Sequence, residues 1–249
     1  MTYSSYHKKA IRNRELHPET QMMSYGYDPF LSEGAGKPPV FLTSTFAFRT
    51  AEDGAAYFDV VAGRKPPPAD SGAGLVYSRF NHPNLEIVED RLALHDGAEG
   101  AIVTSSGMAA IGTVLLTFLK PGEQIVHSTP LYGGTETLIR KILPEWGIGG
   151  HPFTDGLSRA QMDAALEAAA ARGRVGLFYI ETPANPTNAL IDLAAVRAAL
   201  DDFAGRHGYR PVAACDNTLL GPIFQHPIRD GIDLSIYSLT KYVGGHSDL

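Results

Sequence analysis

The stretch VGLFYIETPANP, residues 175–186, places a run of residues typical of a buried strand directly before a polar turn. Similar short apolar runs occupy residues 101–106, 123–128, 211–217 and 232–238. Segments with a helical pattern separate most of these runs. Strands that alternate with helices predict an α/β domain with a mainly parallel sheet. Sheets of this kind bind ligands at the carboxyl ends of their strands.

Five segments between and before the predicted strands have the spacing of helices. They cover residues 84–97, 107–119, 132–147, 157–173 and 191–208. Leu85, Val88 and Leu92 are expected on one face of the first helix. The second is apolar nearly all round, which is typical of a buried helix. Asp192 is a predicted N-cap of the last one.

Residues 1–80 differ in composition from the rest, because proline and glycine are frequent there. Such residues interrupt regular elements. We therefore expect an extended arm with short helices over residues 1–80 and the ligand-binding domain over residues 81–249. An arm of this composition cannot bury Phe41, Phe46 and Phe48 by itself, so it is expected to contact a neighbouring subunit.

The bulk composition excludes several classes of protein. Hydrophobic residues make up 44% of the 249 residues, which argues against global disorder. The formal charge of -6 argues against a nucleic-acid-binding protein, because these usually carry a basic excess. The only cysteine, Cys215, cannot form an internal disulfide. Residues 1–15 lack the apolar core of a secretory signal, and no apolar run approaches the ~18 residues of a membrane span. We expect a cytoplasmic protein.

Polar side chains follow four of the predicted strands. The turn after residues 175–181 offers an amide at Asn185, and the strand 211–217 ends in a carboxylate at Asp216. An amine with neighbouring hydroxyls follows at Lys241, and a helix N-terminus follows residues 101–106. Each feature alone is typical of a turn, a cap or a solvated side chain. One sheet edge that carries all four favours a ligand site.

These groups suit an aldehyde cofactor with a phosphate tail and a pyridine ring. A lysine amine can form a Schiff base with the aldehyde. A carboxylate can keep the ring nitrogen protonated, so that the ring accepts electrons. A helix N-terminus and hydroxyl groups bind phosphate. The set predicts pyridoxal 5'-phosphate (PLP) as the cofactor.

Other ligand classes have less support. SEGAGK, residues 32–37, is similar to half of a P-loop, but Leu31 stands at the first glycine position and Pro38 follows the lysine. No G-x-G-x-x-G follows a predicted strand, and no G-x-S-x-G is present. The nine histidines lack metal-ligand spacing, so no metal is expected.

Seven motifs in fixed order are similar to those of the Cys/Met-metabolism PLP enzymes of fold type I. They are PPVFLTSTFAF, YSRFNHPN, SSGMAAI, LYGGT, ETPANPT, CDNT and SLTKYVGGHSD. That family includes cystathionine γ-synthase, cystathionine lyases, methionine γ-lyase and O-acylhomoserine sulfhydrylases. The resemblance implies a fold type I large domain, with a mainly parallel sheet between helices, preceded by an N-terminal arm.

The resemblance also implies roles at matching positions. The catalytic residues would be Lys241, which holds the cofactor and moves protons, Asp216 at the pyridine nitrogen, and Tyr132 on the ring. The other cofactor contacts would be Gly107, Met108, Asn185, Ser238 and Thr240. Tyr77 and Arg79 would reach the phosphate of a neighbouring subunit, which implies a homodimer as the minimal unit and favours a tetramer.

The activity that the resemblance implies is transsulfuration of a small amino acid. We expect γ-replacement on an O-acylhomoserine-type substrate by a thiol such as cysteine, as in cystathionine γ-synthase. The alternatives are a cystathionine γ- or β-lyase, a methionine γ-lyase-type carbon–sulfur lyase, and a non-catalytic PLP-binding fragment. Gly134 stands where methionine γ-lyases carry a cysteine, which weakens that reading.

Members of the family continue beyond the position that Leu249 matches. Their further residues complete the large domain, add a C-terminal domain and carry the arginine that binds the substrate carboxylate. The resemblance therefore implies a truncated large domain, and we expect these 249 residues by themselves to be inactive.

Overall fold

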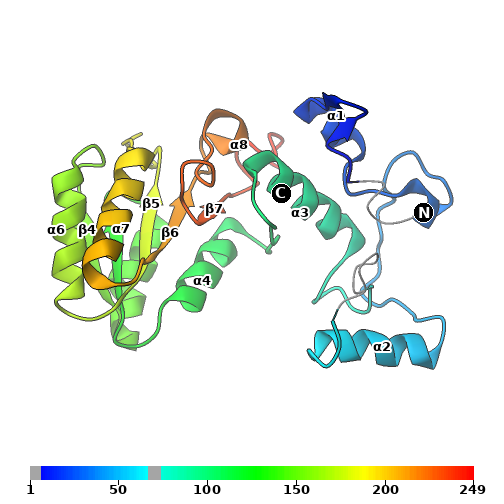
Figure 1. Cartoon of the computed structure of the whole chain (residues 1–249), viewed down its shortest axis with the longest axis horizontal. Coiled ribbons are helices and arrows are strands. Elements are labelled where there is room, and N and C mark those ends of the chain that lie inside the picture. The colour runs from blue at the N-terminus through cyan, green and yellow to red at the C-terminus, as the bar shows by residue number, and fades with distance from the viewer. Residues whose placement is uncertain (1–6, 67–73) are drawn as a thin grey trace. The chain divides into compact units, whose positions relative to one another are not determined.

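The computed structural model describes residues 7–66 and 74–249 (Figure 1). The chain forms two compact units, Met1–Val103 and Thr104–Leu249. The helix α3 (Pro83–Asp96) belongs to the first unit, although the predicted division falls before it. The separate roles predicted for residues 1–80 and 81–249 stay predictions.

The first unit consists of short elements with little burial. It contains β1 (Ala10–Ile11), β2 (Arg14–Glu15), α1 (Pro18–Ser24), η2 (Pro29–Ser32), α2 (Ala51–Val61) and α3. Tyr27, Tyr57 and Ile87 are its buried large side chains among the described residues. Leu85 and Val88 are exposed, so the apolar face predicted for α3 is not a core face within this unit.

The second unit is built on a five-stranded parallel sheet, as the sequence predicts. Its strands are β3 (Gln124–Ser128), β4 (Gly149–Phe153), β5 (Val175–Glu181), β6 (Val212–Asp216) and β7 (Leu234–Ile236). Their order across the sheet is β4-β3-β5-β6-β7. The strand β4 was not predicted, because its residues GGHPF have low strand propensity. Pro152 is tolerated because β4 is an edge strand.

One predicted strand is wrong. Residues 101–106 form no strand, although their composition resembles that of the other strands. A strand needs a neighbour, and none of the described residues pairs with this segment. Instead, the backbone N–H of Val103 donates to the Glu89 carboxylate at 2.8 Å, and the Ile102 side chain is 82% exposed.

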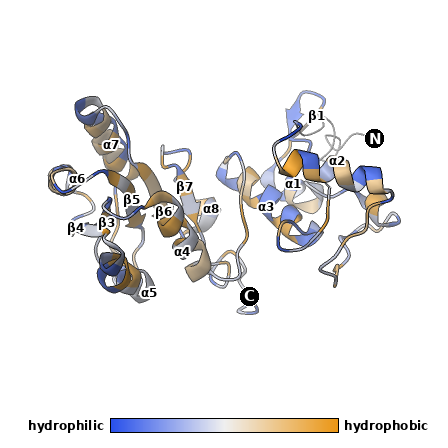
Figure 2. Cartoon of the chain, turned by 90° about the horizontal axis from the view of Figure 1, so that it is seen from below, coloured by the Kyte–Doolittle hydropathy of each residue, from blue (hydrophilic) through white to orange (hydrophobic). Residues whose placement is uncertain are grey.

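Helices cover both faces of the sheet (Figure 2). One face carries α6 (Arg159–Ala170) and α7 (Leu193–His207), and the other carries α4 (Gly107–Phe118) and the segment α5 (Gly133–Thr137), η3 (Leu138–Ile142) and η4 (Leu143–Trp146). Successive strand residues point to opposite faces. Val126 therefore packs in the α6–α7 core, whereas Ile125 packs in the α4 core.

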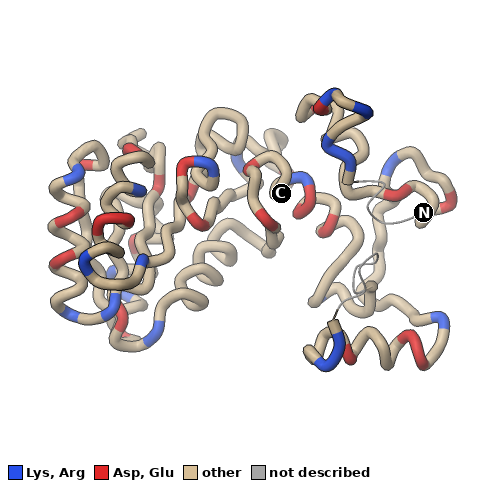
Figure 3. Tube along the Cα trace, viewed as in Figure 1, with Lys and Arg blue, Asp and Glu red and all other residues tan. Residues whose placement is uncertain are grey.

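The helix α4 is buried on one side only. The prediction that residues 107–119 form a helix buried all round was therefore wrong. Ile111, Leu115 and Leu119 are buried, whereas Leu116 is 60% exposed. The helix lies on one face of the sheet, so only one side of it meets the core. No charged residue occurs on α4, whereas charged residues are frequent on α6 and α7 (Figure 3).

The sheet has a topological switch point between β3 and β5. The chain leaves β3 for β4 on one side and returns to β5 on the other. Connections that diverge in this way leave a crevice outside the carboxyl ends of the strands. The segments that follow β3, β5, β6 and β7 meet at this edge, where the sequence analysis expects the ligand site.

Candidate active site

A pocket of about 240 Å³ lies in the second unit at the carboxyl edge of the sheet. Eight of the ten predicted site residues line it, and they come from α4, from the end of β6 and from the segments that follow β3, β5 and β7. These eight are Gly107, Met108, Tyr132, Asn185, Asp216, Ser238, Thr240 and Lys241. The structure thus brings together residues that are as far apart in the sequence as Gly107 and Lys241.

Lys241 lies in a turn after β7. Its backbone N–H donates to the Ser238 carbonyl at 3.1 Å, and its own carbonyl accepts from the Gly245 N–H at 2.9 Å. The Nζ atom is 3.4 Å from the Ser238 hydroxyl oxygen. The backbone of Lys241 is therefore held on both sides, while its exposed side chain lies along the pocket with its amine beside a hydroxyl.

Asp216 is the last residue of β6, and its side chain is buried. Its Oδ1 atom accepts two hydrogen bonds from Thr218, from the backbone N–H at 3.1 Å and from the hydroxyl at 2.6 Å. Burial raises the pKa of Asp216, while the Thr218 hydrogen bonds and the charge of Lys241 oppose that rise. A cation placed beside this carboxylate would be stabilised by a nearby negative charge in a poorly solvated site.

Thr218 is a site residue for which the sequence analysis named no role. Besides donating to Asp216, its hydroxyl oxygen accepts from the backbone N–H of Ser238 at 2.9 Å. Thr218 therefore links the carboxylate at the end of β6 with the residue that stands beside the lysine. The sequence clue is a hydroxyl residue two positions after a strand-end aspartate.

The N-terminus of α4 faces Ser238. The Ser106 hydroxyl caps the helix by accepting from the Ala109 N–H at 3.0 Å. A side chain at Gly107 would stand 2.8 Å from the Ser238 Cβ atom. The absence of a side chain therefore allows a close approach between the helix N-terminus and the segment after β7. Unpaired helix N–H groups with hydroxyls beside them suit a phosphate, so these residues fit the tail of PLP.

Glu181 is a second residue whose role the sequence analysis did not identify. It ends β5, lies opposite Asp216 in the strand register, and is buried. Its Oε2 atom accepts from the backbone N–H of Tyr132 at 2.5 Å, and its Oε1 atom accepts from that of Asn185 at 2.9 Å. Burial raises the pKa of Glu181 to about 7, against the effect of these two hydrogen bonds.

Tyr77 and Arg79 belong to the first unit and do not line this pocket. Tyr77 forms a β-bridge with Thr45. The Arg79 guanidinium lies 5.4 Å from the centre of the Tyr77 ring and 5.2 Å from that of Phe80. Their predicted contact with the phosphate of a neighbouring subunit stays a prediction.

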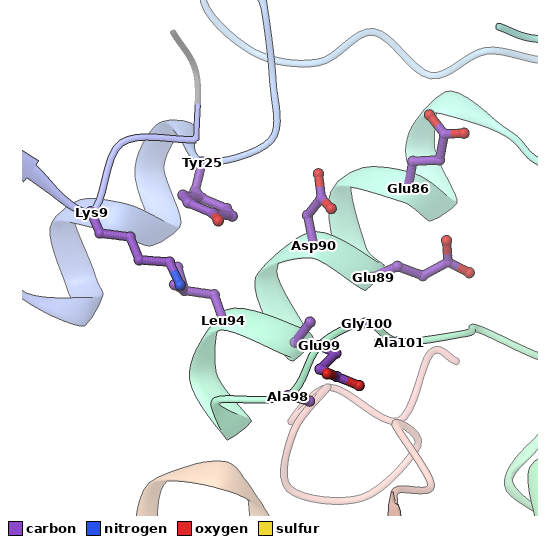
Figure 4. A pocket seen from close by; sticks show the side chains of 11 residues that line it. Lys9, Tyr25, Glu86, Glu89, Asp90, Leu94, Ala98, Glu99, Gly100 and Ala101 are labelled. Carbon is purple, nitrogen blue, oxygen red and sulfur yellow. The ribbon is translucent and has the colours of Figure 1, made fainter. Parts of the chain in front are cut away.

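Figure 4 shows a pocket of about 370 Å³ in the first unit. Four acidic side chains and one lysine lie around it: Glu86, Glu89, Asp90, Glu99 and Lys9. Burial raises the pKa of Glu86. None of the ten predicted site residues lines this pocket, so it is separate from the pocket at the sheet edge.

The substitution Gly107→Ala is expected to weaken PLP binding by about tenfold. The added Cβ would force Ser238 and the helix N-terminus apart, and overpacking of this kind costs ~1–3 kcal/mol. Gly112→Ala is the matched control, because the same helix has open space at that position. It should leave binding unchanged. Titration of each variant with PLP measures the effect, and equal affinities for the two variants would contradict the close approach.

The cofactor-free chain should lose stability as the pH rises from about 4.5 to about 7, and Glu181→Gln should remove part of this loss. The pKa of Glu181 is higher in the folded chain than its usual 4.5, so folding favours the protonated form and the gain disappears above the folded pKa. The free-energy difference between wild type and variant should change by ~2–3 kcal/mol across this range. Urea denaturation at several pH values measures it, and parallel stability curves would contradict the raised pKa.

The fold and the pocket together define a class of protein: a PLP-binding α/β enzyme domain whose lysine, aspartate and helix N-terminus meet at one sheet edge. The family described as Cys/Met metabolism PLP-dependent enzyme matches residues 19–249. The chain belongs to this family, and PLP is its cofactor.

Curated relatives of several activities are similar to the chain. The L-methionine γ-lyase of Pseudomonas deceptionensis is 36% identical over 92% of the chain and 52% of its own length. The O-succinylhomoserine sulfhydrylase of Pseudomonas aeruginosa is 35% identical over 86% and 47%. The cystathionine γ-synthase of Mycobacterium bovis is 33% identical over 93% and 52%. The chain spans about half the length of the curated relatives that it matches.

Two solved structures are similar to this chain in fold. The metB protein of Corynebacterium glutamicum superposes with a TM-score of 0.75 at 28% identity over 94% of this chain and 55% of that one. A structure described as an O-acetylhomoserine (thiol)-lyase of Campylobacter jejuni superposes with a TM-score of 0.77 at 26% identity over 94% and 52%. The latter carries N'-pyridoxyl-lysine-5'-monophosphate, which is the cofactor joined to a lysine.

Among the described residues, no helix combines the length and the apolar character that crossing a membrane requires.

Proposed function

We propose that this chain forms the cofactor-binding part of a transsulfuration enzyme that acts by γ-replacement, similar to cystathionine γ-synthase. The observation that carries the proposal is the pocket at the sheet edge. It joins an amine at Lys241, a buried carboxylate at Asp216 and the N-terminus of α4. These are the groups that an aldehyde, a pyridine nitrogen and a phosphate require.

Each residue has a distinct task in this proposal. PLP, when bound, supplies an electron-accepting ring for reactions at the carbon atoms of an amino acid. Asp216 would stabilise the proton on the ring nitrogen, and Thr218 orients that carboxylate. The Lys241 amine would hold the cofactor at its aldehyde group, and its Nζ atom would hold or move a proton. Tyr132 would cover the ring, and the N–H groups of Gly107 and Met108 with the hydroxyls of Ser238 and Thr240 would bind the phosphate.

The substrate in this proposal is an amino acid with a leaving group on its γ-carbon, such as an O-acylhomoserine, and the second reactant is a thiol such as cysteine. The names of the O-succinylhomoserine sulfhydrylase of Pseudomonas aeruginosa and of the protein described as an O-acetylhomoserine (thiol)-lyase of Campylobacter jejuni support a homoserine-derived substrate.

A carbon–sulfur lyase is the second candidate, because the relative with 36% identity over 92% of the chain is an L-methionine γ-lyase. Position 134, where methionine γ-lyases carry a cysteine, is closely surrounded in this chain. A side chain at Gly134 would stand 2.8 Å from both the Met108 sulfur and the Tyr132 ring. A residue larger than glycine at position 134 would therefore require Met108 and Tyr132 to move.

We expect the 249 residues by themselves to be inactive, so the assays use PLP and a version of the protein extended to the length of its curated relatives. Such assays distinguish the two candidates. γ-Replacement predicts that O-succinylhomoserine or O-acetylhomoserine plus cysteine gives cystathionine faster than cystathionine or methionine is cleaved. Faster release of 2-oxobutyrate and a thiol from cystathionine or methionine would favour the lyase. Turnover of none of these substrates would contradict both.

We further propose a homodimer as the minimal active unit, in which Tyr77 and Arg79 of one subunit contact the phosphate bound by the other. The fork of an arginine side chain suits a phosphate. Both residues lie in a unit whose elements bury few of its own large side chains. Localisation in the cytoplasm and assembly into a tetramer stay predictions.

Mixing an Arg79→Ala subunit with a Lys241→Ala subunit, both extended to the length of the curated relatives, should restore part of the activity. In a mixed dimer, one site carries both defects and the other carries neither, so random mixing should restore about a quarter of the wild-type activity. The measurement is turnover after mixing, with mass spectrometry to show that mixed dimers formed. No recovery despite mixed dimers would place Arg79 in the site of its own subunit.

A further inference from the structure

Glu181 stands where two pocket segments meet at the switch point of the sheet. One segment follows β3 and carries Tyr132, and the other follows β5 and carries Asn185. Each oxygen of the Glu181 carboxylate accepts a backbone N–H from one of these segments, at 2.5 Å for Tyr132 and at 2.9 Å for Asn185. A single side chain thus joins two segments that border the pocket.

The residues that Glu181 holds have exposed side chains. The Tyr132 side chain is 43% exposed, and Asn185 is also exposed, so neither is fixed by a surrounding core. Their backbones, in contrast, are tied to a group that is buried at the end of β5. Hydrogen bonds to an ionised carboxylate are stronger than those to a neutral acceptor. The tie therefore limits how far both side chains can move relative to the sheet.

Burying the Glu181 carboxylate costs solvation free energy. Glu181 is 5% exposed, and Asp216 is its register partner on the neighbouring strand. Within residues 7–66 and 74–249, no lysine or arginine lies within ion-pair distance of Glu181. Burial raises the pKa of Glu181 to about 7, and above that pH the two backbone N–H dipoles stabilise its charge.

We propose that Glu181 is a positioning residue, which holds Tyr132 and Asn185 at the PLP ring by accepting their backbone N–H groups. This proposal rests on the proposed cofactor site. A carboxylate suits the task because it offers two acceptor oxygens, whereas an amide offers one oxygen and an NH₂ group that would oppose the second N–H. Glu181 itself makes no chemical step. It acts through the placement of the two segments.

A double-mutant cycle tests the proposal by PLP affinity, with the circular dichroism of the bound cofactor as a second readout. Glu181→Ala should weaken PLP binding about tenfold when Tyr132 is present, because the backbone N–H groups of Tyr132 and Asn185 lose their acceptor and both segments can then move. In a Tyr132→Ala background, the same change should weaken binding less than about threefold, because only the placement of Asn185 is then still lost. The cofactor signal should be reduced in Glu181→Ala.

Glu181→Gln serves if Glu181→Ala does not fold, and it should show an intermediate loss because it keeps one acceptor. Gln124→Ala is the matched control, since Gln124 is buried at the opposite end of the neighbouring strand β3 and should affect stability without affecting the cofactor signal. Losses of affinity that are equal in both Tyr132 backgrounds would overturn the proposal. Unchanged affinity in both Glu181 variants would also overturn it.

Borohydride reduction of the wild type separates this proposal from the proposed site. If Lys241 carries the label but Glu181→Ala causes equal losses of affinity in both Tyr132 backgrounds, only the role of Glu181 is overturned, and the proposed site stands. Label on a different lysine overturns the proposed site, and the role of Glu181 falls with it.

Discussion

Lys241→Ala is expected to abolish covalent attachment of PLP and to reduce turnover to the background level. Reduction of the wild-type protein with borohydride should leave a pyridoxyl group on the peptide that contains Lys241, and the variant should carry none. The reason is that an amine must lie within bonding reach of the aldehyde. Lys241 is the only lysine that lines the pocket in the part of the chain that the structure describes. Peptide mapping by mass spectrometry measures the label.

Lys120→Ala and Lys141→Ala are suitable controls because both lysines belong to the second unit and neither lines the pocket. Both variants should keep the label on Lys241. Folding of Lys241→Ala should be normal, since the side chain is exposed and its single hydrogen bond is a long one to Ser238. A label of wild-type yield in folded Lys241→Ala would show that another amine holds the cofactor.

Asp216→Ala is expected to lower turnover by about 10²–10⁴-fold, the range for the loss of a group that controls a proton. The carboxylate at the end of β6 would keep the ring nitrogen protonated, and neither alanine nor asparagine carries the charge for this task. Stability should change little or increase, because burial disfavours the ionised form of Asp216 in the cofactor-free chain. Steady-state kinetics and urea denaturation of the same variants measure the two effects.

Asp192→Asn is the contrasting control for Asp216. The Asp192 side chain caps α7 by accepting from the Ala195 N–H at 3.1 Å, and it lies outside the pocket. An asparagine also caps helices well, so both stability and turnover should stay close to wild type. Asp192→Ala should cost ~1 kcal/mol of stability and leave turnover unchanged. If Asp216→Ala kept turnover near the wild-type level, the proposed role at the ring nitrogen would be wrong.

Local sequence patterns were sufficient for most of the second unit. The strand β5 is buried on both faces, so its residues VGLFYIE form an almost continuous apolar run that is easily recognised. The α7 helix has its predicted N-cap at Asp192 and buries Leu193 and Phe203 as its spacing indicates. These patterns depend on residues that are close in the chain. The expectation that functional groups gather at the carboxyl ends of parallel strands follows from them.

Pairing between strands depends on residues that are far apart in the sequence, and for this reason one predicted strand is absent and one observed strand was not predicted. Residues 101–106 have the composition of a strand but find no partner among the described residues. Residues 149–153 have an unfavourable composition but pair with β3 along their whole length. Strand propensity describes how well a side chain fits a half-buried surface, and neighbouring strands supply that surface.

The chemistry of PLP predicts an amine and a carboxylate after strands, which singled out Lys241 and Asp216, whereas Gly107 was predicted from the resemblance to the family. These three assignments stay predictions. The contacts of Glu181 and Thr218 could not be predicted from the chain. Glu181 binds Tyr132 across 49 positions, and Thr218 binds Ser238 across 20. A carboxylate or a hydroxyl after a strand looks like an ordinary turn residue until the fold supplies its partner. Only the parallel register, which sets Glu181 beside Asp216, converts separate polar residues into one site.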